Sequence, residues 1–85
     1  MDIEIGGQRY EIIFGTDSRG VYIEMYSLDT PGQKPFLFAF RSNATGKITV
    51  SMYQGDVELE VLSHFLRVVK QELDPNRWPL LEDLD

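Results

Sequence analysis

The 85-residue chain has no cysteine and a single histidine, and these scarcities remove several kinds of site from consideration. Without cysteine there is neither a disulfide framework nor a thiolate metal site. Zinc sites usually draw three or four ligands largely from cysteine and histidine, so His64 alone does not predict one. The hydrophobic core must therefore stabilise the fold without cross-links, and the composition suits a reducing compartment.

Long apolar runs are also missing. No segment approaches the roughly 18 consecutive apolar residues of a membrane-spanning helix. Residues 1–5 are acidic and alternate between polar and apolar side chains, whereas a secretory signal begins basic and continues apolar. We therefore expect a cytoplasmic protein with no membrane association.

Positive charge is scarce as well, since eight lysines and arginines stand against fourteen aspartates and glutamates, for a formal net charge of −6. Most of the excess lies late in the chain, where residues 56–85 contain three basic and eight acidic side chains. Such a field repels phosphate backbones and attracts basic partners. We therefore expect a protein partner with a basic surface, or self-association, in preference to nucleic acid.

The first two thirds of the chain show a β pattern. Gly6-Gly7 separates two alternating runs, and adjacent glycines suit a type I′ hairpin because both accept positive φ. This turn predicts a register in which Ile5 faces Gln8, Ile3 faces Tyr10 and Glu4 faces Arg9.

Four further strands are predicted, separated by turn-rich residues. They cover residues 8–14, 21–28, 36–41 and 47–53. Pro31-Gly32 lies in the longest connection and predicts a type II turn. Because every connection is short, the sheet is expected to be an antiparallel meander over about residues 2–53.

One helix is predicted after the strands, over about residues 56–73. Asp56 occupies the expected N-cap position, where a carboxylate accepts a free backbone N–H. Apolar side chains recur at three- and four-residue spacing and should pack on the sheet; they are Leu62, Phe65, Leu66, Val69 and Leu73.

The residues after Asp74-Pro75 form an acidic tail, 74–85. Trp78 in this tail is expected to fold back over the helix or a sheet edge, with docking into a partner as the alternative. The complete prediction is a single α+β domain of residues 1–85: a five-stranded antiparallel meander, one C-terminal α-helix packed across one face, and a short acidic tail.

No residue pattern predicts a catalytic, cofactor or metal site. His64 follows Glu60 by one helical turn, but the sequence identifies no nucleophile beside it. The glycine-rich turns lack the strand, loop and helix context of a phosphate-binding loop. We therefore expect a protein that is not an enzyme and needs no cofactor.

The sheet face away from the helix is the candidate binding surface. The residues expected under the helix are Val21, Ile23, Met25, Phe36, Phe38, Phe40, Ile48, Val50 and Met52. The other face would then present the candidate partner-binding residues, which are Tyr22, Tyr26, Tyr53, Leu37, Arg9 and Arg41. Tyrosine and arginine are frequent hot spots of interfaces, although tyrosine also has a high β propensity.

Together these features favour a small acidic regulator, inhibitor or immunity-like protein that binds a partner, or itself, through the exposed sheet face. A single-stranded nucleic-acid-binding domain is the alternative. Aromatic side chains on a sheet can stack on unpaired bases while arginines contact phosphates.

Overall fold

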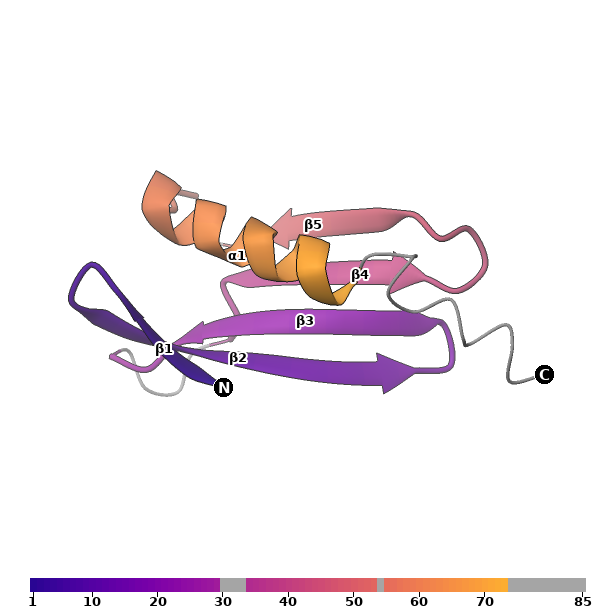
Figure 1. Cartoon of the computed structure of the whole chain (residues 1–85), viewed down its shortest axis with the longest axis horizontal. Helices are drawn as coiled ribbons and strands as arrows, with labels where there is room; N and C mark the ends of the chain where they lie inside the picture. Colours follow the sequence, from indigo (N-terminus) through magenta and orange to yellow (C-terminus); the bar gives the residue numbers. More distant parts are fainter. Residues whose placement is uncertain (30–33, 54, 74–85) are drawn as a thin grey trace.

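A computed structural model describes residues 1–29, 34–53 and 55–73. The strands are β1 (Asp2–Ile5), β2 (Gln8–Asp17), β3 (Gly20–Ser27), β4 (Leu37–Ser42) and β5 (Ile48–Met52), followed by helix α1 (Leu59–Glu72). Each strand pairs antiparallel with the next, so β1 and β5 form the two edges of one open sheet (Figure 1). The predicted α+β fold is confirmed. The predicted turn at Pro31-Gly32 and the acidic tail with Trp78 lie outside the described residues.

The first hairpin has the predicted geometry. Gly6 and Gly7 have φ values of 58° and 83°, the positive values that a type I′ turn requires at both central positions. The register is also as predicted, with Ile5 opposite Gln8, Ile3 opposite Tyr10 and Glu4 opposite Arg9.

The second hairpin turns later than predicted. Residues 15–20 were expected to form a loop, but β2 continues to Asp17 and the turn is confined to residues 18 and 19. Asp17 stabilises this turn because its Oδ1 accepts hydrogen bonds from the backbone N–H groups of Arg19 (2.7 Å) and Gly20 (3.2 Å). Gly15 stays in the strand opposite Tyr22, whose ring fills the space of the missing side chain.

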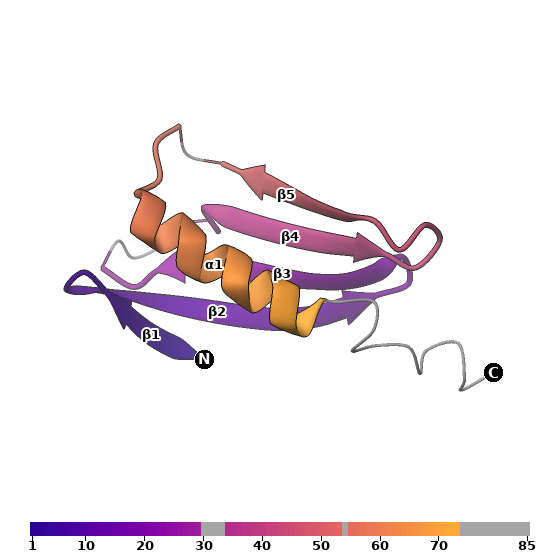
Figure 2. The ribbon, with the colours of Figure 1, turned by 45° about the horizontal axis from the view of Figure 1, so that its top comes forward.

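Helix α1 crosses one face of the sheet, which we call the helix face (Figure 2). Its buried residues Val61, Phe65, Val68 and Val69 join the strand side chains in one hydrophobic core. The largest fully buried side chains are Phe65, Ile12, Ile23, Met25, Leu37 and Leu73. Each such burial contributes about 1.5–3 kcal/mol, so this layer supplies most of the driving force for folding.

The helix begins three residues later than predicted. Glu58, not Asp56, is the N-cap residue, and no side chain caps it. Val57 and Leu62 occupy the positions of a hydrophobic staple, and both pack against the core. Apolar contact at Val57 therefore keeps residues 56–58 outside the helix, and the first helical bond runs from Leu62 N–H to the Glu58 carbonyl at 3.0 Å.

The helix covers less of the sheet than the sequence suggested. Val50 and Met52 lie on the helix face of β5 by register, but they are 39% and 49% exposed. A helix about 10 Å wide spans only roughly two strand spacings of about 4.8 Å. The edge strand β5 is therefore left partly uncovered on this face.

Candidate interaction surface

The sheet face opposite α1 is termed the outer face. Cross-strand partners share a face, and the pairs Tyr22–Phe40, Glu24–Phe38 and Glu11–Tyr26 all belong to this one. Within residues 1–29, 34–53 and 55–73, α1 is the only helix and it lies on the other side (Figure 2). No helix or strand of the described chain therefore packs on the outer face.

Four aromatic side chains, Tyr22, Tyr26, Phe38 and Phe40, form what we call the aromatic patch of this face. All four are half-buried. The rings of Tyr22 and Phe38 stack with their centroids 5.8 Å apart and their planes 13° apart. The Arg19 guanidinium lies 5.7 Å from the centroid of the Phe40 ring. Tyr22 and Phe38 thus hold each other in place, and Arg19 contacts Phe40, which lowers the entropy that binding would cost.

The sequence prediction placed the β4 side chains on the wrong faces. Leu37 pairs with Met25 and is fully buried on the helix face, and Arg41 pairs with Val21 on the same face. Phe38 and Phe40, which were expected under the helix, lie on the outer face instead. Residues 36–40 are apolar at every position, so an alternating pattern cannot indicate which side faces the core.

Arg41 is therefore an internal residue and does not contribute to the surface. It is 5% exposed, and its Nε has no hydrogen-bond partner in the described part of the chain. A buried polar group without a partner destabilises the folded state.

The other predicted partner-binding residues are accessible. Tyr22 and Tyr26 belong to the aromatic patch, and Tyr53, just beyond β5, is 61% exposed. Arg9 lies on the outer face of β2, where its backbone N–H donates to Asp29 Oδ2 at 3.1 Å. Its side chain lies 3.5 Å from Asp29 Oδ1.

Two carboxylates are placed among the aromatic rings. Glu11 lies opposite Tyr26, and Glu24 lies opposite Phe38. Burial raises the pKa of the Tyr26 hydroxyl. This pKa is raised further by the charge of Glu24, by the hydrogen bond between Tyr26 and Glu24, and by the charge of Glu11. Neither glutamate forms an ion pair with lysine or arginine among the described residues, so the patch is electrostatically negative.

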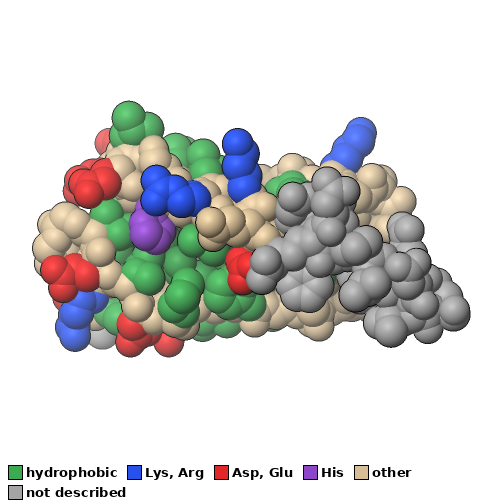
Figure 3. Space-filling model, viewed as in Figure 1, with side chains coloured by type: hydrophobic (Ala, Val, Ile, Leu, Met, Phe, Trp, Pro, Cys, Tyr) green, Lys and Arg blue, Asp and Glu red, His purple; other side chains and the backbone are tan. Residues whose placement is uncertain are grey.

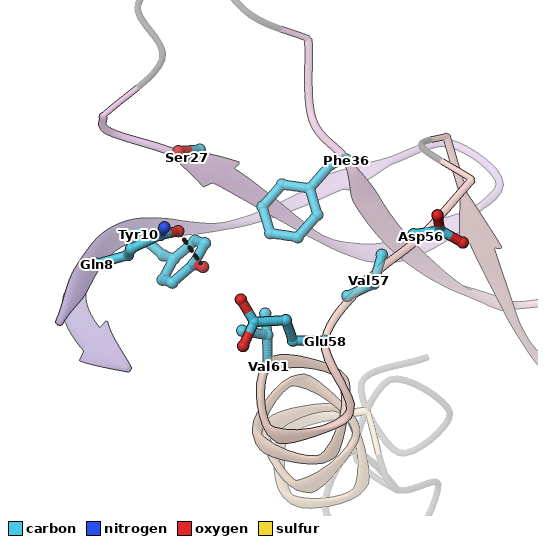
Figure 4. Close-up of a pocket in the computed structure, with 8 residues that line it drawn as sticks. All are labelled: Gln8, Tyr10, Ser27, Phe36, Asp56, Val57, Glu58 and Val61. Carbon is cyan, nitrogen blue, oxygen red and sulfur yellow. Dashed lines mark hydrogen bonds between the residues drawn. The ribbon is translucent and has the colours of Figure 1, made fainter. Parts of the chain in front are cut away.

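A small cavity lies elsewhere, between the sheet and the start of α1 (Figure 4). Its volume is about 190 Å³, and its lining residues are Gln8, Tyr10, Ser27, Phe36, Asp56, Val57, Glu58 and Val61. The Tyr10 hydroxyl donates to Gln8 Oε1 at 3.0 Å, and the Tyr10 and Phe36 ring centroids are 5.6 Å apart.

The chemistry of this cavity does not activate its tyrosine. Burial raises the pKa of Tyr10, and the charges of Glu58, Asp29 and Glu60 add to that effect. Acidic side chains gather at the same end of the molecule, where α1 begins (Figure 3). A phenol with a raised pKa stays protonated near neutral pH and is a poor nucleophile or base.

His64 is half-buried on α1. Among the residues that the structure describes, no three histidine, aspartate or glutamate side chains are placed to hold a metal ion. In that same part of the chain, no helix combines the length and apolar character needed to cross a membrane.

Comparison with models of protein families, with curated proteins and with solved structures gave no match to this chain.

Proposed function

We propose that this protein is a small non-enzymatic interaction module, of the regulator, inhibitor or immunity-like kind, that binds a partner protein through the aromatic patch. One observation supports this most: four half-buried aromatic side chains, two of them stacked on each other, occupy a sheet face that no described helix or strand covers. Tyrosine-rich surfaces of this kind supply large contact area at a low entropic cost.

The mechanism that we propose is occlusion. The partner loses access to its own functional surface because the rigid sheet face covers it. Half-buried rings that already stack, such as Tyr22 and Phe38, need little reordering before they bind. The excess of carboxylates over the whole chain would steer a basic partner in the cytoplasm.

Single-stranded nucleic acid is the second candidate ligand, because the aromatic patch could stack on unpaired bases. The two carboxylates within the patch, Glu11 and Glu24, disfavour it, since they repel phosphates. Anisotropy titrations with single-stranded oligonucleotides at low and moderate salt separate the two ideas. We expect a flat titration, whereas strong salt-dependent binding would favour the nucleic-acid function.

Affinity purification tests the protein-binding proposal with two matched variants. Tyr22→Ala combined with Tyr26→Ala removes half of the aromatic patch. The control, Leu59→Ala, removes an apolar side chain that is 75% exposed on α1. We expect the wild type and the control to retain a stoichiometric partner that the double variant loses.

Circular dichroism spectra of all three proteins should agree, which excludes unfolding as the cause of a loss. If the double variant retains the partner as well as the control does, the outer face is not the binding surface.

A further inference from the structure

The two edges of the sheet differ in how they are protected. A strand edge presents unpaired N–H and C=O groups that can pair with another strand, and charged side chains usually prevent this. The β1 edge has exposed Asp2 and Glu4. In contrast, residues 48–53 contain no charged side chain, and Val50, Met52 and Tyr53 are exposed. Among the described residues, the β5 edge therefore has no charged side chain to protect it.

The backbone of β5 offers a regular set of free groups at this edge. Tyr53 N–H bonds to the Phe36 carbonyl, and Ser42 N–H bonds to the Lys47 carbonyl, each at 3.0 Å. The odd-numbered residues of β5 and its two flanking positions, 47 and 53, thus direct their backbone N–H and C=O groups toward β4. Because an antiparallel ladder alternates, Ile48, Val50 and Met52 direct theirs toward the free edge.

We propose that β5 is a homodimerisation strand, which pairs antiparallel with β5 of a second copy about a two-fold axis at Val50. The three outward residues of each copy would then form about six hydrogen bonds across the seam. The two five-stranded sheets become one continuous sheet. This proposal does not depend on the proposed function of the outer face.

The sequence of β5 is complementary to itself in this register. Val50 meets Val50 of the second copy at the axis. Ile48 meets Met52 on the helix face, and Thr49 meets Ser51 on the outer face, so apolar groups pair with apolar groups and hydroxyls with hydroxyls. Lys47 and Tyr53 come opposite each other at the two ends, where a cation can lie over an aromatic ring.

A second copy fits the β5 edge, whereas the β1 edge does not suit pairing with its own copy. An isologous two-fold contact closes on itself and uses one patch twice. Pairing β1 with its own copy would instead bring Asp2 and Glu4 near the same acidic residues of the second molecule. The seam at β5 contains no like charges.

The dimer has a consequence for the outer face. Residues opposite each other across an antiparallel seam point to the same side, so both α1 helices lie on one side of the sheet. The aromatic patches of both copies then lie together on the other side, which creates a bivalent surface.

Sedimentation velocity over a concentration series tests the proposal. We expect the wild type to dimerise with a dissociation constant on the order of micromolar, as a small interface allows. Val50→Lys and Val50→Glu should each be monomeric, since the two-fold axis brings identical charges together. A 1:1 mixture of the two variants should recover a heterodimer, because Lys then faces Glu.

The matched control is Ile13→Lys. Ile13 is 38% exposed, close to the 39% of Val50, but it lies on the outer face of β2. This variant should dimerise like the wild type.

Several results would overturn the proposal. They are a wild type that stays monomeric at about 1 mM, a Val50→Lys variant that still dimerises, open-ended assembly, or a variant mixture that stays monomeric. If the charged variants fail to fold, amide hydrogen exchange of the wild type tests whether β5 forms the dimer seam. The Val50 N–H should exchange at least about tenfold more slowly at high than at low protein concentration, and equal rates would reject the seam.

Discussion

Gly15 and Gly20 allow a sharp test of how β2, β3 and β4 are packed. Neither glycine has a positive φ, so alanine can adopt the backbone conformation at both positions. A Cβ at residue 15 would overlap the tip of the Tyr22 ring, with Cε1 2.7 Å away. A Cβ at residue 20 would overlap the backbone carbonyl of Arg41 and lie 2.8 Å from Phe40 Cζ.

The magnitudes differ because only one of these obstacles can move. For Gly15→Ala, the loss of glycine flexibility in the unfolded chain contributes about 0.4–1 kcal/mol of stability. Displacing Tyr22 from its stack on Phe38 costs about 0.5–1.5 kcal/mol, so the net change is within about 1 kcal/mol of zero. For Gly20→Ala, the main chain of β4 must shift, and overpacking of this kind costs about 1–3 kcal/mol or more.

Urea denaturation followed by circular dichroism measures both changes. We expect Gly20→Ala to be about 1 kcal/mol less stable than Gly15→Ala. The Gly15→Ala change should also couple to Tyr22→Ala in a double-mutant cycle, because the three atoms nearest to the new methyl group all belong to the Tyr22 ring and its hydroxyl. Equal destabilisation by the two alanines, or no coupling at position 15, would refute this packing.

Three further predictions concern buried or titrating groups. Arg41→Met should leave the free energy of unfolding, measured by thermal denaturation, unchanged or raise it by about 1–4 kcal/mol, because the buried Nε has no partner among the described residues; a loss would show that the guanidinium is satisfied. The backbone hydrogen bond from Arg19 holds the pKa of Asp17 below its usual value, so this group stabilises the fold above its unfolded pKa and loses that effect as pH falls; Asp17→Asn should flatten the acid limb of the stability profile, and an unchanged limb would contradict this. Burial and Glu24 raise the pKa of Tyr26 in the folded state. Its contribution to the free energy of unfolding is therefore complete below the unfolded pKa and is lost as pH rises through the folded pKa. Tyr26→Phe should remove this loss of stability at alkaline pH, as unfolding curves above about pH 10 would show.

The elements that are determined by neighbouring residues in the sequence could be predicted. Two adjacent glycines permit a type I′ turn, and that turn fixed the register of the first hairpin and the faces of Ile3 and Glu4. The order of five strands and one helix followed in the same way from short connections and apolar spacing. These features depend on neighbouring residues alone.

The faces of β4 could not be predicted because they depend on the partner strand. Phe38 and Ala39 are both apolar, and only the pairing with β3 decides which one faces α1. The aromatic patch therefore emerged with two tyrosines that the sequence indicated and two phenylalanines that it assigned to the core. Gly20 was the sequence feature that could have indicated the outer face for Phe40, because it leaves room for the Phe40 ring.

The predicted start of α1 was wrong for a similar reason. Asp56 has the ideal side chain for an N-cap, but Val57 is held against the core one residue later. Tertiary packing outweighed a capping preference of about 1 kcal/mol. The capping preference of Asp56 alone cannot show whether the helix begins there or after Val57.

Hydroxyl-radical footprinting of the 85-residue chain tests the central claim most directly, since it reports the accessibility of individual aromatic side chains. Tyr22, Tyr26 and Phe38 on the outer face should be oxidised several times faster than Phe65, which is fully buried under α1. Oxidation of the three patch residues at the slow rate of Phe65 would mean that something covers this face in the free protein, and the proposed binding surface would not exist.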